Sequence, residues 1–230
     1  MATIISIETS ADVCSVALSS DGFILLHFEE WESHNHAARL SGFLSECMEH
    51  LRRHDMGLDA VAVSMGPGSY TGLRIGLSEA KGLAYSLGIP LIGVDTLKLL
   101  VTHVMFAGAE LPDDTLYCPM VDARRMEVFT GVYDIALNEV ATPGPMILDE
   151  TSLADILDRN HVAIFGTGSD KAVPVIRHPN ALYISGVVPL ATDMVALAEK
   201  AWHARDFLDL AYSTPNYLKA FQGTQPKARI

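Results

Sequence analysis

The residues from Ser64 to Gly76 constrain the fold more than any other part of this sequence. The apolar run at 59–64 predicts a buried strand, and a Gly-Pro-Gly corner and a helix-like segment follow it at once. Glycine allows a left-handed backbone and a close approach at such a corner, and Ser69 is placed to cap the helix. The free N–H groups of that helix start suit an anion such as phosphate, although a plain strand-to-helix turn has the same sequence.

Two standard phosphate motifs do not fit this corner. A Walker loop requires Lys directly after its last glycine, whereas Gly72 is followed by Leu73. A dinucleotide fingerprint requires a third glycine where Thr71 stands, and it normally follows the first strand of its unit rather than the fourth. The corner therefore belongs to neither class.

Three glycines, Gly72, Gly76 and Gly82, lie inside the helix expected to run to about Leu87. Each costs a helix interior about 1 kcal/mol relative to alanine, so a compensating close contact is expected. Gly72, Gly76 and Ala80 share one helix face, which lets another backbone approach, either in the chain's own sheet or on a partner helix. In the partner arrangement, leucine at Gly76 would block association and leave the fold intact.

Composition limits the classes of function. The 230 residues are 49% hydrophobic with a formal net charge of −12, so they can form a sizeable core and are not expected to grip nucleic acid alone. No leader peptide is expected from the first residues, and no run reaches the roughly 18 apolar residues of a membrane span. The scattered Cys14, Cys47 and Cys118 suit reduced core thiols in a cytoplasmic protein.

The chain reads as two similar halves. The expected strands are 3–7, 13–18, 23–28, 60–63 and 91–94 in the first half and 116–121, 127–133 and 162–165 in the second. The expected helices are 34–54, 70–87, 96–106, 152–158, a segment opened by a second glycine corner at Gly166 and Gly168, and 190–208. An acid, Glu8 or Asp122, follows the first strand of each half. We expect an α/β fold with two related subdomains, 1–98 and 99–230, around a cleft; chance similarity between α/β halves is the competing interpretation.

These features resemble one superfamily and one family within it. The order of elements is similar to that of the actin/Hsp70/sugar-kinase superfamily (the ribonuclease H-like ATPase fold), whose two subdomains hold a nucleotide between them. More specifically, the chain resembles the TsaB (YeaZ) family, which takes part in threonylcarbamoyladenosine synthesis on bacterial tRNA. The matching motifs lie in family order at 7–10, 14–18, 66–85, 121–128 and 215–219.

The resemblance implies that the first turns and glycine corners are vestiges of a nucleotide site. The candidates are Glu8, Thr9, Ser10, Gly66, Gly68, Ser69, Thr71, Asp122, Gly166 and Gly168. The family commonly has Asp at the position of Glu8 and often Arg at that of Lys219, so the chain departs from the pattern at both. A lysine also lacks the bidentate fork of arginine. No cofactor is expected.

No catalytic residue and no metal site are expected. The resemblance implies that the catalytic relative TsaD binds a metal through two histidines on the helix after the fifth strand, where this chain has only His103. His50 and His54 have the same i, i+4 spacing in the first long helix, but Arg52 and Arg53 beside them oppose cation binding.

The resemblance implies a non-catalytic scaffold that dimerises with a TsaD-like subunit through the N-terminal subdomain and is joined by a TsaE-like ATPase. TsaD transfers threonylcarbamoyl to adenosine 37 of tRNAs that read codons starting with A, so this chain would meet tRNA only through the complex. The candidate contact residues are Leu40, Leu44, Leu51, Gly72, Leu73, Gly76 and Ala80. A symmetric version of the contact could give a homodimer.

A different class of function uses the same cleft: an active ATP-dependent small-molecule kinase or ATPase. Glu8 and Asp122 would then bind Mg²⁺–ATP, with the glycines of both corners near the phosphates. The sequence offers this alternative no evident catalytic base and no phosphate-gripping lysine.

Overall fold

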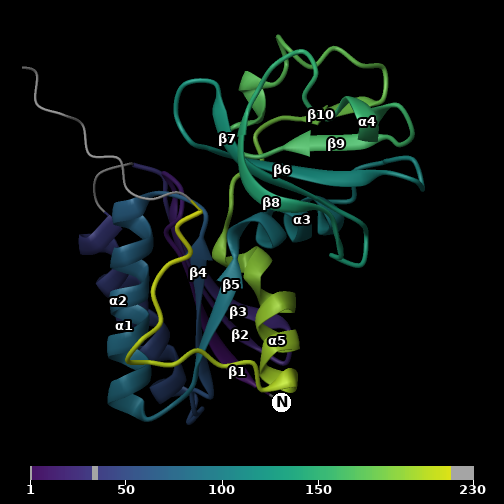
Figure 1. Cartoon of the computed structure of the whole chain (residues 1–230). Helices are drawn as coiled ribbons and strands as arrows, with labels where there is room; N and C mark the ends of the chain where they lie inside the picture. Colours follow the sequence, from purple (N-terminus) through teal and green to yellow (C-terminus); the bar gives the residue numbers. More distant parts are fainter. Residues whose placement is uncertain (1, 33–35, 219–230) are drawn as a thin grey trace, which may run out of the picture.

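The computed structural model describes residues 2–32 and 36–218, which form two halves, each built on a five-stranded sheet (Figure 1). Lys219 lies outside the described residues. The strands of the first sheet are β1 (Thr3–Glu8), β2 (Cys14–Ser20), β3 (Phe23–Glu30), β4 (Ala60–Gly66) and β5 (Leu91–Asp95). Those of the second are β6 (Leu116–Asp122), β7 (Glu127–Tyr133), β8 (Glu139–Ile147), β9 (Val162–Phe165) and β10 (Ala181–Ile184).

The two sheets have the same topology. The first has the order β3-β2-β1-β4-β5 and the second β10-β9-β6-β7-β8, which is the same order read from the other edge. In each half the first strand pairs antiparallel with the second and parallel with the fourth. The expected duplication is therefore confirmed, and chance similarity does not explain a shared strand order.

Strand β1 is buried along its whole length, and its alternate residues point to opposite faces of the sheet. Both faces of the first sheet are therefore covered by helices. Ile5 and Ile7 pack toward α1 (His36–Arg53) and α2 (Tyr70–Leu87). Ile4 packs on the other face, with Met194 and with α5 (Val195–Ala204). The helix α3 (Thr96–Phe106) lies between the halves, since its residues join the cores of both sheets.

In the second half, one predicted helix is wrong and another is longer than the α-helix that forms. The second glycine corner opens only the 3-10 turn Ser169–Lys171, and Pro174 follows too closely for an α-helix to continue past it. The segment expected as a helix over 190–208 starts as the 3-10 turn Ala191–Met194 and ends after α5 at Arg205, which is left-handed with φ 54°. The short helix α4 (Ala154–Leu157) lies inside the range expected for it.

The chain after α5 returns along the first half as an extended strap, residues 208–217, drawn in yellow in Figure 1. The Leu208 N–H donates to the Leu91 carbonyl at 2.8 Å, and the Asn216 N–H donates to the Met65 carbonyl at 2.6 Å. Lys81 of α2 donates to the Ser213 carbonyl at 2.7 Å. The first half is thus completed by residues from the end of the described chain.

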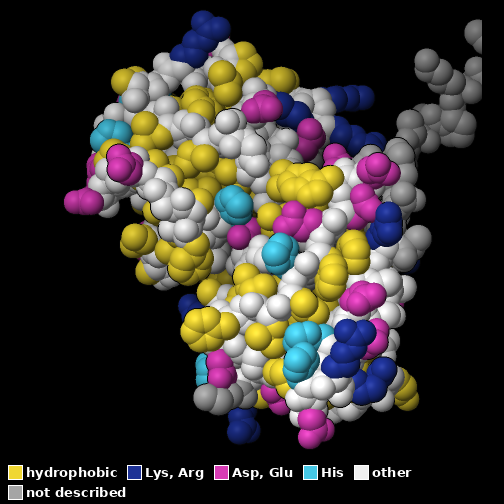
Figure 2. All heavy atoms as spheres, turned by 180° about the vertical axis from the view of Figure 1, so that it is seen from behind, with side chains coloured by type: hydrophobic (Ala, Val, Ile, Leu, Met, Phe, Trp, Pro, Cys, Tyr) yellow, Lys and Arg dark blue, Asp and Glu magenta, His cyan; other side chains and the backbone are white. Residues whose placement is uncertain are grey.

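The three cysteines are buried, as the sequence predicts, and burial raises the pKa of the Cys14 thiol to about 11 and those of Cys47 and Cys118 to about 12. Among the described helices, none is long and apolar enough to cross a bilayer. On the face shown in Figure 2, hydrophobic side chains gather around the junction of the halves, with histidine and acidic side chains among them.

Candidate functional site

The glycine corner after β4 packs tightly on the first turn of the same half. Ser69 caps α2, because its hydroxyl accepts from the Gly72 N–H at 3.2 Å. The Ser69 N–H donates to the Ser10 carbonyl at 2.7 Å, and a Cβ at Gly68 would collide with that same carbonyl oxygen. The predicted cap is confirmed, and glycine at position 68 serves the close approach of the two turns.

A cleft of about 690 Å³ separates these turns from the corresponding turns of the second half. Five of the predicted nucleotide-site residues line it: Ser10, Gly68, Ser69, Thr71 and Asp122. The other five, Glu8, Thr9, Gly66, Gly166 and Gly168, are not among its lining residues. The Thr9 hydroxyl donates to the Gly72 carbonyl at 2.8 Å, and the corner glycines pack against backbone or side chains behind the cleft.

The acids that end the first strand of each half, Glu8 of β1 and Asp122 of β6, are both engaged within the chain. Lys171 lies 2.6 Å from Asp122 Oδ1 and also donates to the Glu127 carbonyl at 3.2 Å. Glu8 is fully buried and accepts from the Ser10 N–H. Burial raises the pKa of the Glu8 carboxyl, while the hydrogen bond from the Ser10 N–H opposes that shift.

These acids do not together present free carboxylate oxygens to one point in the cleft. Mg²⁺ needs carboxylate oxygens that can reach it with nearly octahedral geometry. Within the described residues, no group of three or more His, Cys, Asp or Glu side chains is placed to hold a metal ion. Glu8 and Asp122, as they are placed here, do not form the carboxylate pair that the kinase alternative assigns to them.

Cations in the cleft were missed by the sequence interpretation. Lys171 lines the cleft together with Arg124 and Arg125, which occupy the turn between β6 and β7 with φ of 70° and 50°. The adjacent arginines in a predicted turn were a signal that could have been used. Lys171 gave no such signal, because 49 positions separate it from Asp122 and only the fold brings them together.

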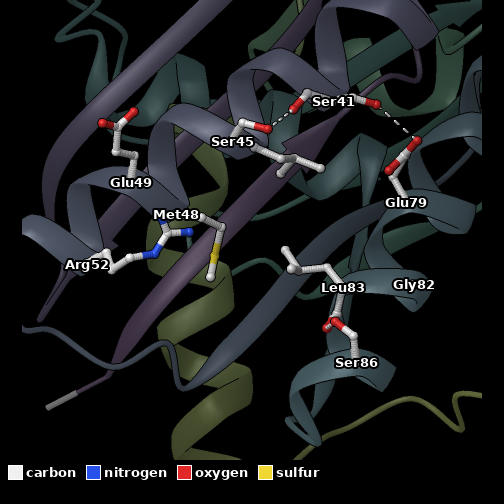
Figure 3. A pocket seen from close by; sticks show the side chains of 10 residues that line it. Ser41, Ser45, Met48, Glu49, Arg52, Glu79, Gly82, Leu83 and Ser86 are labelled. Carbon is white, nitrogen blue, oxygen red and sulfur yellow. Dashed lines mark hydrogen bonds between the residues drawn. The ribbon is translucent and has the colours of Figure 1, made fainter.

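A second hollow, of about 520 Å³, lies between α1 and α2 on the outside of the first half. Figure 3 shows Met48 and Leu83 projecting into the space between the helices. At one end, Ser41 of α1 donates to Glu79 of α2 at 3.4 Å. Gly82 lines the same hollow, and a Cβ built there would meet nothing within 4 Å. We call this hollow the helix groove.

Six of the seven residues predicted to carry the partner contact lie under this surface rather than on it. All seven are buried in the chain's own core: Leu40, Leu44, Leu51, Gly72, Leu73, Gly76 and Ala80. Leu44 alone among them also lines the helix groove. A Cβ at Gly72 or Gly76 would collide with Thr9, so the small-residue face serves close packing on the chain's own first turn, and the expectation of a partner helix there is wrong.

His103, His50 and His54, the histidines considered as metal ligands in the sequence, contact other side chains of the chain. His103 Nδ1 lies 2.9 Å from Asp193 Oδ2, and this hydrogen bond raises the pKa of the imidazole. The rings of His50 and His54 contact each other at the end of α1, with centroids 4.4 Å apart. Asp95 also has a structural role, because it caps α3 by accepting from the Lys98 N–H at 3.0 Å.

Comparison with known sequences places this architecture among tRNA-modification proteins. The family profile of TsaD, tRNA N6-adenosine threonylcarbamoyltransferase, matches residues 30–218. The tRNA threonylcarbamoyladenosine biosynthesis protein TsaB of Escherichia coli is 30% identical over 226 residues, 94% of each chain. The Bacillus subtilis TsaB is 34% identical over 131 residues, and that match spans 57% of this chain and about half (55%) of the relative.

Solved structures of similar fold agree with the sequence relatives. A Pseudomonas aeruginosa protein described as similar to the peptidase YeaZ superposes with a TM-score of 0.81 at 25% identity, covering 95% of this chain and 100% of the other. YeaZ from Pseudomonas aeruginosa superposes with a TM-score of 0.78 at 26% identity, covering 94% and 100%.

Proposed function

The chain belongs to the TsaB (YeaZ) family, and from that premise we propose that it is a non-catalytic scaffold in the synthesis of threonylcarbamoyladenosine on tRNA. In this role it dimerises with a TsaD-like catalytic subunit, which a TsaE-like ATPase joins. The TsaD-like subunit transfers threonylcarbamoyl to adenosine 37 of tRNAs that read codons starting with A. The complex works where tRNA is modified, in the cytoplasm.

The observation that carries the non-catalytic role is the state of the two cleft acids. Lys171 already neutralises Asp122, and Glu8 is buried behind the cleft with a raised pKa that favours its neutral form. A kinase of this fold needs carboxylates that face the nucleotide and hold its metal. These two acids serve the chain's own structure instead, and this supports the proposal that the chain works by binding.

The helix groove is the surface we assign to the TsaD-like subunit. It lies on the first half, between two long helices whose inner faces are fully used by the core. Met48 and Leu83 supply apolar contact, and Glu49, Arg52 and Glu79 supply a polar rim around it. This composition is typical of a protein–protein interface, with an apolar centre and charged edges. The same groove on a second copy could form a homodimer when the partner is missing.

Gly82 allows a sharp test of this assignment. A Cβ there meets no atom of the chain within 4 Å, so we expect the fold to accept a leucine whose side chain fills the groove and excludes the partner helix. The matched control is Gly82→Ala, which makes the same backbone change with little added volume. Size-exclusion chromatography with light scattering, with the TsaD homologue of the same organism, should give a heterodimer for wild type and Gly82→Ala and separate monomers for Gly82→Leu.

Two outcomes would contradict the proposal at different levels. Normal association of the Gly82→Leu protein would move the contact away from the helix groove. Failure of the wild-type chain to associate with TsaD at all would reject the scaffold role. In that case, tight binding of Mg²⁺–ATP in calorimetry that Asp122→Asn abolishes would favour the kinase alternative.

A further inference from the structure

One part of the surface combines exposed arginine and tyrosine side chains beside the cleft. Arg124 and Arg125 line the cleft from the second half, and Tyr70 lines it from the first. Tyr70 also lines an adjoining pocket of about 310 Å³, together with Arg74 of α2 and Tyr217 of the strap. Tyr70 is therefore shared by the two hollows. We call these five residues the cleft rim.

The charge of the cleft rim contrasts with that of the chain as a whole. The sequence has a net charge of −12, yet the rim contains three arginines and no acid. Within residues 2–32 and 36–218, neither Arg124 nor Arg125 has an ion-pair partner. Two acids, Asp12 and Asp122, line the cleft beside the rim, and Lys171 forms an ion pair with Asp122. The exposed positive charge matches a partner that carries repeated negative charges.

The aromatic residues of the rim are held in place with their rings accessible. Tyr70 and Tyr217 have ring centroids 4.9 Å apart and remain 38% and 40% exposed. Arg74 donates to the Tyr70 hydroxyl at 2.7 Å, and its guanidinium lies 5.3 Å from the centre of that ring. Tyr217 is anchored by its neighbours, because Pro215 is buried and the Asn216 N–H bonds to Met65. A fixed, half-exposed aromatic ring is a platform on which a base can stack.

We propose that the cleft rim binds a single-stranded segment of RNA, with phosphates on the arginines and an unpaired base stacked on Tyr217. This inference rests on the proposed function, since it gives the chain its own contact with the tRNA that its complex modifies. Arginines on both sides of Tyr70 suit a strand with several phosphates rather than one nucleotide. Duplex RNA fits less well, because its paired bases do not offer a face to tyrosine.

The test measures binding of a labelled single-stranded oligoribonucleotide of about twelve nucleotides to the full chain by fluorescence anisotropy at low salt. The charge variant is the double change Arg124→Asn and Arg125→Asn, because asparagine tolerates the positive φ of both positions. Its matched control is Arg205→Asn, which removes one exposed arginine of similar φ, 54°. Arg205 lies near Leu208, which pairs with Leu91 at the start of β5, so it is at the end of the first sheet opposite the cleft.

The expected results separate charge from stacking. The double arginine variant should bind about tenfold more weakly, and its salt-dependence slope should fall by about 0.7 for each phosphate that the protein no longer neutralises. Tyr217→Ala should also lose about tenfold in affinity, whereas Tyr217→Phe, which keeps the ring, should bind like wild type. Arg205→Asn should bind like wild type. Thermal unfolding of each variant checks that the fold is retained.

Three results would overturn the inference. One is the absence of saturable RNA binding by the wild-type chain, and another is an equal loss of affinity in the Arg205→Asn control. The third result has two parts: ADP displaces the RNA completely, and the chain binds the RNA no more tightly than it binds ADP. That result would mean that the site is a pocket for a mononucleotide. Association of the wild-type chain with the TsaD homologue is measured in parallel. A wild-type chain that associates but does not bind RNA rejects only this inference, and one that binds RNA but does not associate rejects only the scaffold role.

Discussion

Thr9 occupies the space that a side chain at Gly76 would need. A Cβ at Gly76 would collide with Thr9 Oγ1 and lie 3.4 Å from both Thr9 Cβ and Thr9 Cγ2. Thr9 cannot easily move, since it is fully buried and donates to the Gly72 carbonyl one turn earlier in α2. The turn after β1 and the helix after the glycine corner are thus fitted to each other.

We predict that Gly76→Ala destabilises the chain by about 1–3 kcal/mol, although alanine has the higher helix propensity. Overpacking against Thr9 outweighs the gain in propensity. Gly82→Ala, in the same helix but facing open space, should instead raise the free energy of unfolding by up to about 1 kcal/mol. Urea denaturation of the two variants and wild type measures both effects.

A double variant sharpens this test. Thr9→Ala removes Oγ1, the atom with which a Cβ at position 76 collides, so Thr9→Ala combined with Gly76→Ala should be more stable than the sum of the single changes predicts. Simple additivity of the two changes, or a Gly76→Ala protein as stable as Gly82→Ala, would show that the close approach is not constraining.

The Glu8→Gln variant should be more stable than wild type near pH 8, and this difference in stability should disappear near pH 4. The ordinary pKa of such a carboxyl is 4.5, and burial raises it in the folded chain. As pH rises above 4.5, the unfolded chain loses this proton before the folded chain does, so the free energy of unfolding of wild type falls. The effect amounts to about 1.4 kcal/mol for each unit by which the pKa is raised.

Chemical denaturation of both proteins across this pH range measures the difference. A Glu8→Gln protein whose stability relative to wild type does not change with pH would mean that Glu8 is not held in its neutral form. A loss of tRNA modification with unchanged stability would instead favour a chemical role for the carboxylate.

His103→Gln should destabilise the chain most at acidic pH. The hydrogen bond to Asp193 raises the His103 pKa above its ordinary value of 6.5. The stabilisation is therefore complete below pH 6.5 and is lost as the pH rises through the higher folded pKa. We expect a loss of about 1 kcal/mol near pH 5.5 and less near pH 8.5.

The matched control is His161→Gln. His161 and Asp114 lie at the same 2.9 Å, but their side chains are 36% and 57% exposed against 27% and 15% for the His103 pair. Water screens the exposed pair, so its removal should change stability little. Equal losses in the two variants, or a His103→Gln effect that grows with pH, would contradict the prediction.

Lys81→Met should loosen the strap. Lys81 holds the Ser213 carbonyl at 2.7 Å, and the strap continues to the Asn216 N–H, which bonds to Met65. Loss of one charge-assisted hydrogen bond, about 1.5 kcal/mol, should raise hydrogen exchange of the Asn216 amide by about tenfold. Lys200→Met on α5 is the control and should leave that amide unchanged, whereas unchanged exchange in Lys81→Met itself would show that the strap is held elsewhere.

Local signals were sufficient to predict the elements whose patterns are strong. The corner, its Ser69 cap and α3 could be predicted because glycine, capping residues and apolar periodicity act within a few residues. The edge strand β8 could not, since Pro143, Gly144 and Pro145 are typical of loops. An edge strand tolerates proline because one side of it has no hydrogen-bonding neighbour.

The candidate site was predictable only in part, for a related reason. Small residues at Gly72 and Gly76 indicate a close approach whether the neighbour is the chain's own turn or another protein. Only the position of Thr9 in the fold decides between them. Likewise, the engagement of Asp122 by Lys171 depends on contacts across 49 positions, which no local pattern records.

The return of the chain to its first half has a consequence for synthesis on the ribosome. Domains generally fold as units while the chain emerges, with the N-terminal one first. Here Ile4 and Ala62 lack their contacts with Met194 and Ala198 until those two residues have been synthesised. The β-bridge between Leu91 and Leu208 likewise cannot form before Leu208 has been added. The half that begins the chain is thus among the last parts to be finished, and a ribosome that stalls within the second half would leave an apolar sheet face open to chaperones.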